Sequence, residues 1–219
     1  MIQLHRLAAA RSVAALFAAA ALVAACSVGP GASPPSPVVS SQPPVTLPPS
    51  SGSAPATACP TTGPQPMPAG EKHVVTIDTA KGAIEVTVEG DLGPLAAQNF
   101  VDLAACGFYD GTVFHRVVPG FVIQGGDPTG TGSGGPGYEF KDDPVNVPYK
   151  RGVVAMANSG PNTNGSQFFI VLADAGLPPQ YSVFGNVTKG MEAVDAIAAA
   201  ADAENPSSPI KMDKVTVAP

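Results

Sequence analysis

Charged residues are scarce in this sequence, and basic residues are the scarcer kind. Asp, Glu, Lys and Arg make up 13% of the 219 residues, and 17 acidic residues against 11 basic ones give a formal net charge of −6. The basic residues form no cluster along the chain. Proteins that bind nucleic acid or an anionic membrane surface need a basic patch. We therefore expect no nucleic-acid partner and no electrostatic contact with a membrane.

The sequence also lacks the patterns of a metal, phosphate or covalent site. The four acidic residues between positions 127 and 143 do not have the spacing of a calcium-binding loop. A Gly-Gly pair at 125–126 is not part of a phosphate-binding loop of the Gly-x4-Gly-Lys-Ser/Thr type. Ser166 stands in no recognisable pattern with a base. We expect no cofactor and no metal ion.

The N-terminal residues have the pattern of an export signal. A basic start with Arg6 and Arg11 is followed by an apolar run over residues 12–25, which is too short to span a bilayer as a helix. The run ends in small residues directly before Cys26, which resembles the lipobox of bacterial lipoproteins. We expect residues 1–25 to be a signal peptide, Cys26 to be lipidated, and the exported protein to be anchored at the outer face of a bacterial cell membrane. The alternative is an ordinary signal peptide with an incidental cysteine.

Residues 26–70 differ in composition from everything that follows. Pro, Ser, Ala and Gly dominate this segment, and it contains no charged residue and no apolar periodicity. Such a composition buries too little apolar surface to offset the entropy of ordering, so we expect a disordered tether. The remaining residues, 71–219, are enough for one domain with a hydrophobic core.

Three cysteines are present, and one is used if Cys26 is lipidated. Cys59 and Cys106 then remain as a pair in an exported, oxidising setting, where disulfides form. A disulfide that ties the end of the tether to the domain is one interpretation. Two free thiols are the other, because sequence does not show how far apart the two residues lie.

The domain reads as many short strands with two helices. Helices are predicted over residues 94–106, with Pro94 at the first position and Gly107 after the end, and over residues 189–200. Alternating or continuous apolar runs predict strands at 73–78, 83–88, 111–118, 121–124, 152–157, 167–172, 182–187 and 211–217. This pattern predicts a mostly β fold, a closed antiparallel barrel whose ends are covered by two α-helices.

Two segments carry a more specific signal. They read FHRVVPGFVIQGGD (residues 114–127) and MANSGPNTNGSQFF (residues 156–169), and each places a few polar side chains among aromatic and aliphatic ones. Together they closely resemble the two defining segments of the cyclophilins, the cyclosporin-binding peptidyl-prolyl cis-trans isomerases. The similarity continues from the hairpin at Val74 to the final strand, about two-thirds of the chain.

The resemblance implies an eight-stranded barrel with a helix at each end and a peptide groove on its outer surface. It implies that Arg116 is the catalytic arginine, while His115 beside it is structural. The other implied site residues bind the substrate. The proline pocket is formed by Phe121, Val122, Phe169 and Leu177, the peptide backbone is bound by Gln124 and Asn158, and the rim consists of Ala157, Gln167, Tyr181 and Phe184.

The resemblance therefore predicts a monomeric, non-covalent isomerase that acts on proline-containing segments of exported proteins. A cyclophilin-fold chaperone or peptide-binding module at the cell envelope is the alternative. Two positions depart from the family pattern. Many cyclophilins have a tryptophan, which helps to bind cyclosporin, where this chain has Gly176, and the sequence contains no tryptophan at all. Tyr181 stands where eukaryotic members often have histidine. We expect turnover to persist and cyclosporin binding to be weakened.

Overall fold

The computed structural model describes residues 58–219 of the chain. The predicted signal peptide, the predicted lipidation site Cys26 and most of the predicted tether lie outside the described residues. None of the helices in the described part has both the length and the apolar character needed to cross a membrane.

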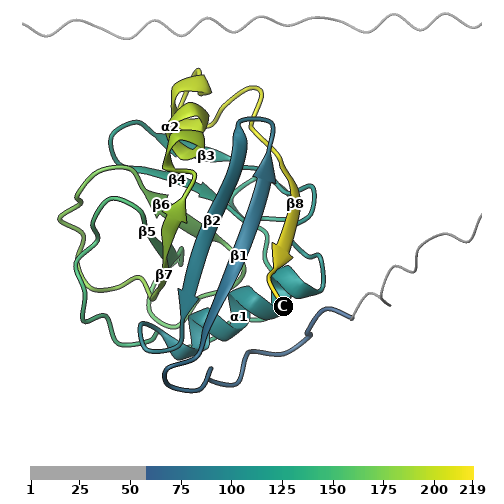
Figure 1. Cartoon of the computed structure of the whole chain (residues 1–219), viewed down its shortest axis with the longest axis vertical. Coiled ribbons are helices and arrows are strands. Elements are labelled where there is room, and N and C mark those ends of the chain that lie inside the picture. Colours follow the sequence, from purple (N-terminus) through teal and green to yellow (C-terminus); the bar gives the residue numbers. More distant parts are fainter. Residues whose placement is uncertain (1–57) are drawn as a thin grey trace, which may run out of the picture. The chain divides into compact units, whose positions relative to one another are not determined.

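Eight antiparallel strands form one curved sheet (Figure 1). Along the sheet the order is β3-β4-β6-β5-β7-β2-β1-β8. The strands are β1 (Lys72–Thr79), β2 (Gly82–Glu89), β3 (Arg116–Val118), β4 (Val122–Gly125), β5 (Val153–Met156), β6 (Phe168–Val171), β7 (Val183–Lys189) and β8 (Met212–Val217). The predicted eight-stranded, mostly β architecture with two helices is confirmed.

The sheet is an open half-barrel, which corrects the expectation of a closed one. No ladder joins β3 to β8 within residues 58–219, and Val113 and Lys211 form only an isolated bridge there. The predicted strand at 111–118 is regular only from Arg116 onward. Instead of a strand, the connection between α2 and β8 follows the free edge of β3, and Pro206 and Pro209 in that connection have no N–H to donate to a ladder.

Two helices lie at opposite ends of the half-barrel (Figure 1). They are α1 (Pro94–Ala105) and α2 (Met191–Ala200). The residue before α1 is Gly93, which has no side chain to cap the helix. The carboxylate of Asp143 takes over this task by accepting hydrogen bonds from the backbone N–H groups of Leu95 (3.2 Å) and Ala96 (2.9 Å). A residue 47 positions away thus fixes the start of α1 on the barrel.

The apolar side chains of the strands pack into two hydrophobic clusters, one on each face of the sheet. The larger cluster fills the half-barrel and is centred on Phe100 of α1, whose ring lies 5.1 Å from that of Phe168. The smaller cluster lies on the other face of the sheet and contains Phe169 and Val122. Because successive residues of a strand point to opposite faces, Phe168 belongs to the core while Phe169 faces outward. This alternation supplies the apolar side chains of the site described below.

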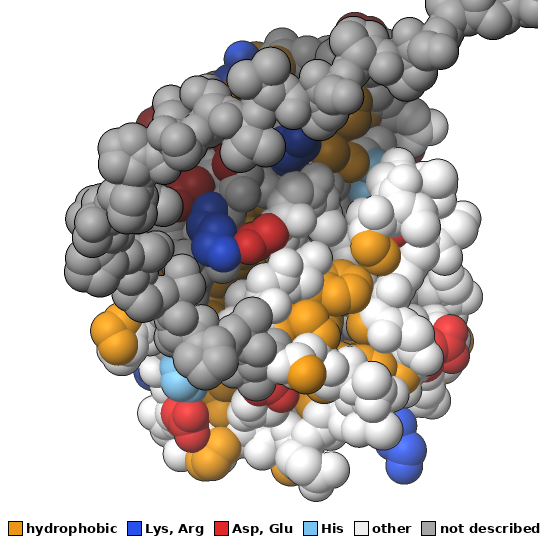
Figure 2. Space-filling model, turned by 90° about the vertical axis from the view of Figure 1, so that its right-hand side faces the viewer, with side chains coloured by type: hydrophobic (Ala, Val, Ile, Leu, Met, Phe, Trp, Pro, Cys, Tyr) orange, Lys and Arg blue, Asp and Glu red, His pale blue; other side chains and the backbone are white. Residues whose placement is uncertain are grey.

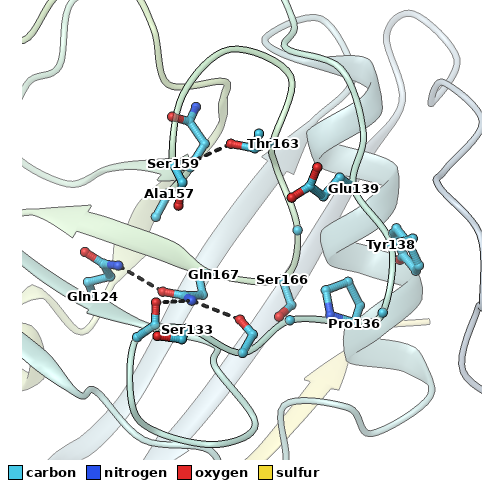
Figure 3. A pocket seen from close by; sticks show the side chains of 16 residues that line it. Gln124, Ser133, Pro136, Tyr138, Glu139, Ala157, Ser159, Thr163, Ser166 and Gln167 are labelled. Atoms are coloured by element: carbon cyan, nitrogen blue, oxygen red, sulfur yellow. Dashed lines mark hydrogen bonds between the residues drawn. The ribbon is translucent and has the colours of Figure 1, made fainter.

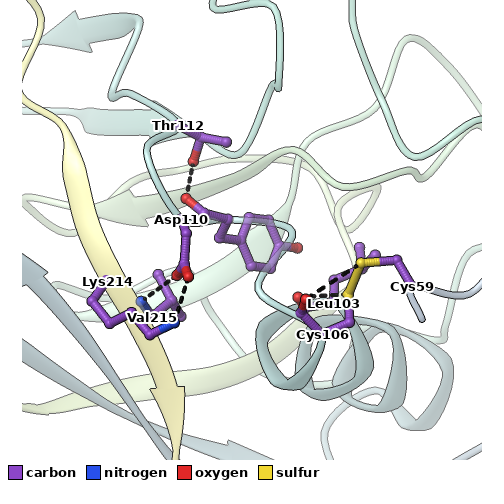
Figure 4. Close-up of polar contacts among 8 residues, drawn as sticks. Cys59, Leu103, Cys106, Asp110, Thr112, Lys214 and Val215 are labelled. Atoms are coloured by element: carbon purple, nitrogen blue, oxygen red, sulfur yellow. Dashed lines mark hydrogen bonds and ion pairs between the residues drawn. A yellow bond between two sulfur atoms is a disulfide. The ribbon is translucent and has the colours of Figure 1, made fainter. Parts of the chain in front are cut away.

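The ordered domain begins before residue 71, which corrects the predicted end of the tether. Met67 is buried, and its backbone N–H donates to the carbonyl of Pro94 at 3.0 Å. Cys59 is joined to Cys106 at the end of α1 by a disulfide, with the two Cα atoms 5.1 Å apart (Figure 4). This is the first of the two interpretations that the sequence leaves open. Residues 58–70 are held against the domain because one of their few large apolar side chains finds a place in the core.

Candidate active site

A pocket of about 270 Å³ opens on the outer face of the sheet. A pocket of this size suits an amino-acid ring and its peptide bond better than a large cofactor. Nine of the eleven residues predicted for the site line it: Arg116, Phe121, Val122, Gln124, Ala157, Asn158, Phe169, Leu177 and Tyr181. They come from β3, β4 and β6, from the turn between β3 and β4, and from the loops that follow β5 and β6.

The apolar wall of the pocket is closely packed and hydrogen-bonded. Val122 and Phe169 are buried by the second hydrophobic cluster. Tyr181 packs edge-on against Phe169 with ring centroids 5.5 Å apart. Tyr149 holds the backbone of Tyr181 in place. The Tyr149 hydroxyl donates to the Tyr181 carbonyl (2.9 Å) and accepts from the Tyr181 N–H (3.0 Å). A ring that enters the pocket therefore meets a surface that is already formed.

Arg116 is the one residue with a charged side chain among those described residues that line the pocket. It begins β3 and pairs across the ladder with Gln124 of β4. Its side chain is 36% exposed. Nη1 donates to Gln124 Oε1 at 3.4 Å, and Nε donates to Glu204 Oε1 at 2.7 Å. The guanidinium is thus held by hydrogen bonds to Glu204 and Gln124, and its remaining N–H groups are available at the pocket.

A directed chain of hydrogen bonds sets the orientation of Gln124. Gln167 donates both of its amide hydrogens, to the carbonyls of Gly132 (3.0 Å) and Gly134 (2.9 Å) (Figure 3). Its Oε1 is therefore left to accept, and it accepts from Gln124 Nε2 at 3.0 Å. Gln124 must then turn its own Oε1 toward Arg116. The carbonyls of a glycine-rich loop in this way determine which atom the arginine meets.

Gln167 lies beside the 270 Å³ pocket and lines a second hollow. This hollow has a volume of about 580 Å³ and shares Gln124, Ala157 and Asn158 with the first pocket. Its other side is the glycine-rich loop of residues 132–137 together with Tyr138 and Glu139 (Figure 3). The expected place of Gln167 at the rim is therefore refined to the boundary between two adjoining hollows.

Asp127 organises the glycine-rich loop, a role that the sequence did not reveal. Its buried carboxylate accepts hydrogen bonds from the hydroxyl of Thr129 and from the backbone N–H groups of Thr129, Thr131, Gly132 and Gly134. Burial would raise the pKa of this carboxyl, but these hydrogen bonds outweigh it and hold the pKa well below its usual range. A Cβ atom at Gly134 would collide with the carboxylate, so glycine is required there.

Asn158 fastens the rim to neighbouring segments. Its Nδ2 donates to the carbonyl of Gln180 at 2.9 Å, and its Oδ1 accepts from the backbone N–H of Gly160 at 3.3 Å. Gln180 directly precedes Tyr181, so this contact also holds the aromatic side of the pocket. The side chain of Asn158 thus joins the two loops that border the pocket.

Phe184 does not lie at the rim, which corrects the position that the resemblance implied. It is fully buried in the core, with its ring 4.8 Å from that of Phe100. Its neighbour Val183 is the residue of β7 that joins the cluster on the pocket face. Because side chains alternate along the strand, Phe184 must point into the half-barrel.

His115, beside Arg116 in the sequence, is buried. Burial of the ring lowers its pKa, while the negative charge of Asp127 opposes the shift only in part. The imidazole is therefore neutral at pH 7 and carries no charge beside Arg116. It packs under the glycine-rich loop, where Gly132 comes close to the ring.

The face of the domain shown in Figure 2 has no cluster of basic side chains among the described residues. On this face, Lys and Arg side chains lie apart from one another, and hydrophobic side chains are scattered among polar ones. Residues 58–219 contain no group of three or more His, Cys, Asp or Glu side chains arranged to hold a metal ion. The pocket around Arg116 combines a concave shape, apolar side chains and one charged group.

Known proteins are similar to this chain over most of the described residues. Residues 74–217 match the family model described as cyclophilin type peptidyl-prolyl cis-trans isomerase/CLD. A probable peptidyl-prolyl cis-trans isomerase A from Mycobacterium leprae is 44% identical over 172 residues, which are 67% of this chain and 93% of that protein. Peptidyl-prolyl cis-trans isomerase CYP18-1 of Arabidopsis thaliana is 44% identical over 152 residues, covering 65% of this chain and 94% of the relative.

Solved structures show the same fold. The crystal structure of a cyclophilin type peptidyl-prolyl cis-trans isomerase from Cryptosporidium parvum has a TM-score of 0.64 and 36% identity, and the match covers 68% of this chain and 99% of that one. A second crystal structure of that protein, in the presence of the dipeptide Ala-Pro, has a TM-score of 0.63 with 36% identity and covers 67% and 99% of the two chains.

Proposed function

The chain belongs to the cyclophilin-type peptidyl-prolyl cis-trans isomerases and is an enzyme of that class, and we propose that it accelerates rotation about X–Pro bonds in exported proteins, assisted by Arg116. The observation that carries the proposal is the single guanidinium at the edge of a closely packed apolar pocket. The Ala-Pro dipeptide present with the related Cryptosporidium structure supports a small X–Pro unit as occupant.

To catalyse this rotation, a site has only to position the X–Pro bond and to place a charged group beside it. Rotation about the peptide bond meets a barrier of about 18–20 kcal/mol, because the amide loses its resonance when it twists. The two isomers of an X–Pro bond differ by only about 0.5–1 kcal/mol, so the enzyme must supply speed without shifting the equilibrium. No covalent bond is broken, and no proton has to move.

Arg116 supplies the charge at the point where the transition state needs it. When the amide twists, its nitrogen recovers lone-pair character and can accept a hydrogen bond. A guanidinium at the pocket edge can donate that bond, and it is stronger to the twisted nitrogen than to the planar one. Arginine suits this role because its planar fork is permanently charged and presents several donors in fixed directions.

The apolar wall and the polar rim of the pocket bind different parts of the substrate. Val122 and Phe169 hold the proline ring, while Gln124 beside Arg116 binds the backbone on the other side of the rotating bond. The proline ring is held still while the chain on the other side of the X–Pro bond can turn. Binding therefore favours the twisted amide over either planar isomer. Asn158 contributes by fixing the loops that border the groove.

We further propose that the protein is exported and held at a membrane by lipidation of Cys26. The proposal rests on the sequence of residues 1–26 and on the disulfide between Cys59 and Cys106. Disulfides persist in oxidising compartments outside the cytoplasm and are rare inside it. Substrates of the enzyme would then be segments of other exported proteins.

Complementation in cells that lack the protein tests both parts of the proposal. We expect the wild-type chain to fractionate with membranes and Cys26→Ala to be released from them. Arg116→Ala should reach the membrane like the wild type but fail to restore the phenotype. If Arg116→Ala restores it fully, peptide binding without turnover is the function. If Cys26→Ala remains membrane-bound after a carbonate wash, lipid anchoring at that residue is wrong.

Cyclosporin should bind weakly, and a single substitution should strengthen the binding. Gly176 stands next to Leu177 of the pocket wall, and a Cβ atom at Gly176 would meet no other atom within 4 Å. The Cβ atom of a tryptophan would therefore meet no clash there, and its indole is the group that many cyclophilins place at this position. We expect Gly176→Trp to lower the inhibition constant of cyclosporin by about tenfold or more, since burying an aromatic ring is favourable by more than 1 kcal/mol. A nanomolar constant for the wild-type protein would contradict this expectation.

A further inference from the structure

We propose that Glu204 is a positioning residue of the isomerase site, which holds the guanidinium of Arg116 by its Nε so that Nη1 stays on the side of Gln124 and the pocket. The inference rests on the proposed catalytic role of Arg116. Glu204 lies 88 residues away in the sequence and belongs to none of the segments that predict the site. It acts on the arginine and does not line the pocket.

The contact with Glu204 is the shorter of the two that hold the arginine side chain. Nε of Arg116 lies 2.7 Å from Glu204 Oε1, whereas Nη1 lies 3.4 Å from Gln124 Oε1. The Glu204 contact also joins two opposite charges, whereas Gln124 Oε1 is a neutral acceptor. Because Glu204 takes the Nε donor, the Nη groups are not diverted from Gln124 and the substrate.

The backbone places Glu204 beside Arg116 through its neighbour Val117. The N–H of Val117 donates to the carbonyl of Glu204 at 2.7 Å, and the N–H of Phe114 donates to the carbonyl of Ile210 at 2.9 Å. Residues 204–210 therefore run along the free edge of β3, at the opening of the half-barrel. The open edge is thus used to bring a carboxylate to the arginine of the site.

The connection that carries Glu204 has an internal structure of its own. The carboxylate of Asp202 accepts hydrogen bonds from the backbone N–H (3.0 Å) and the hydroxyl (2.5 Å) of Ser207. Ile210 packs against the core of the half-barrel. Glu204 is bracketed by these two attachments, so its carboxylate is presented from a fixed backbone although its side chain is 58% exposed.

The expected effect is modest because the ion pair is exposed. Pairs of this kind change an equilibrium by at most about fivefold. We expect Glu204→Ala, assayed in the full chain by exchange NMR on an uncharged Ala-Pro peptide, to lower kcat/KM about two- to fivefold. The loss should appear in kcat, with KM nearly unchanged, since the arginine acts in the twisted state. Glu204→Gln keeps an acceptor for Nε but loses the charge. Its kcat/KM should lie between that of Glu204→Ala and that of the wild type.

A double-mutant cycle separates positioning from a general effect on the fold. In an Arg116→Ala background, Glu204→Ala should have no further effect, because the group that it positions is gone. Glu85→Gln is a matched control, since Glu85 pairs with Lys189 on the surface and should leave kcat/KM unchanged.

Three outcomes would overturn the inference. An equal loss from Glu204→Ala in both backgrounds would show that the effect passes through the fold. A gain in kcat/KM would show that Glu204 competes with substrate for the arginine, and an unchanged value would show that it is idle. If Arg116→Ala itself leaves kcat/KM unchanged, the proposed arginine-assisted mechanism fails, and that failure is distinct from failure of the role of Glu204.

Discussion

Replacing Arg116 by alanine is expected to lower kcat/KM at least about tenfold, equivalent to a loss of about 1.4 kcal/mol or more in transition-state stabilisation. Arg116 is the one charged group among the described residues of the pocket, so no neighbour can supply a charged donor in its place. Arg116→Lys keeps the charge but loses the planar fork, and its activity should lie much closer to the alanine variant than to the wild type. A protease-coupled isomerisation assay measures each variant.

The matched control for this prediction is Arg151→Ala. Arg151 is also a half-exposed arginine, and it forms a two-point ion pair with Asp195 at 2.7 and 3.0 Å, away from the residues that line the pocket. Its loss should change stability slightly and kcat/KM not at all. Circular dichroism should show an intact fold in both variants. Near-normal turnover by Arg116→Ala, with the fold intact, would refute the proposed role of the arginine.

Removing the disulfide is expected to have the largest effect on stability. Cys59 and Cys106 close a loop with a sequence separation of 47 residues, and a crosslink over such a loop stabilises a domain by about 2–4 kcal/mol, mainly by restricting the unfolded chain. The double variant Cys59→Ser, Cys106→Ser should therefore unfold at a temperature about 5–15 °C lower. Its kcat/KM at 25 °C should be unchanged, because the pocket lies on other elements.

Treatment with a reductant supplies an internal check on this prediction. Dithiothreitol should lower the Tm of the wild type toward that of the double variant, while the variant itself should not respond. A shift below about 2 °C in both experiments would mean that Met67 and its contacts hold residues 58–70 without help from the crosslink.

Strands with one exposed face were predictable from the sequence, and strands buried on both faces were less so. The hairpin of β1 and β2 and the helix α1 follow from plain alternation and from Pro94 at the helix start. In β7 the first three residues are all buried, so the pattern that would separate Val183 from Phe184 is missing. Nothing in the sequence therefore indicated which of the two faces the pocket.

The parts of the site that escaped prediction depend on contacts between distant segments. Arg116, Gln124 and Gln167 stand in two recognisable segments, and the structure brings them together. Glu204 reaches Arg116 only because a connection follows the open edge of β3. Met67, alone in a proline-rich stretch, has no apolar periodicity around it that would mark it as a core residue. The role of Asp127 could not be predicted, because most of its partners are backbone N–H groups. Every residue except proline has such a group, so the sequence does not indicate which ones a carboxylate will bind.

The disulfide at the end of α1 also determines how the domain carries mechanical load. Tension on the chain before Cys59 is passed through the sulfur atoms to Cys106 and into α1, which is packed against the core. Residues 60–71 and β1 then lie outside the path of the force. Without the covalent link the same pull would detach Met67 first and then peel β1 from between β2 and β8. A pull on the chain before Cys59 therefore acts on a helix and leaves the sheet unloaded.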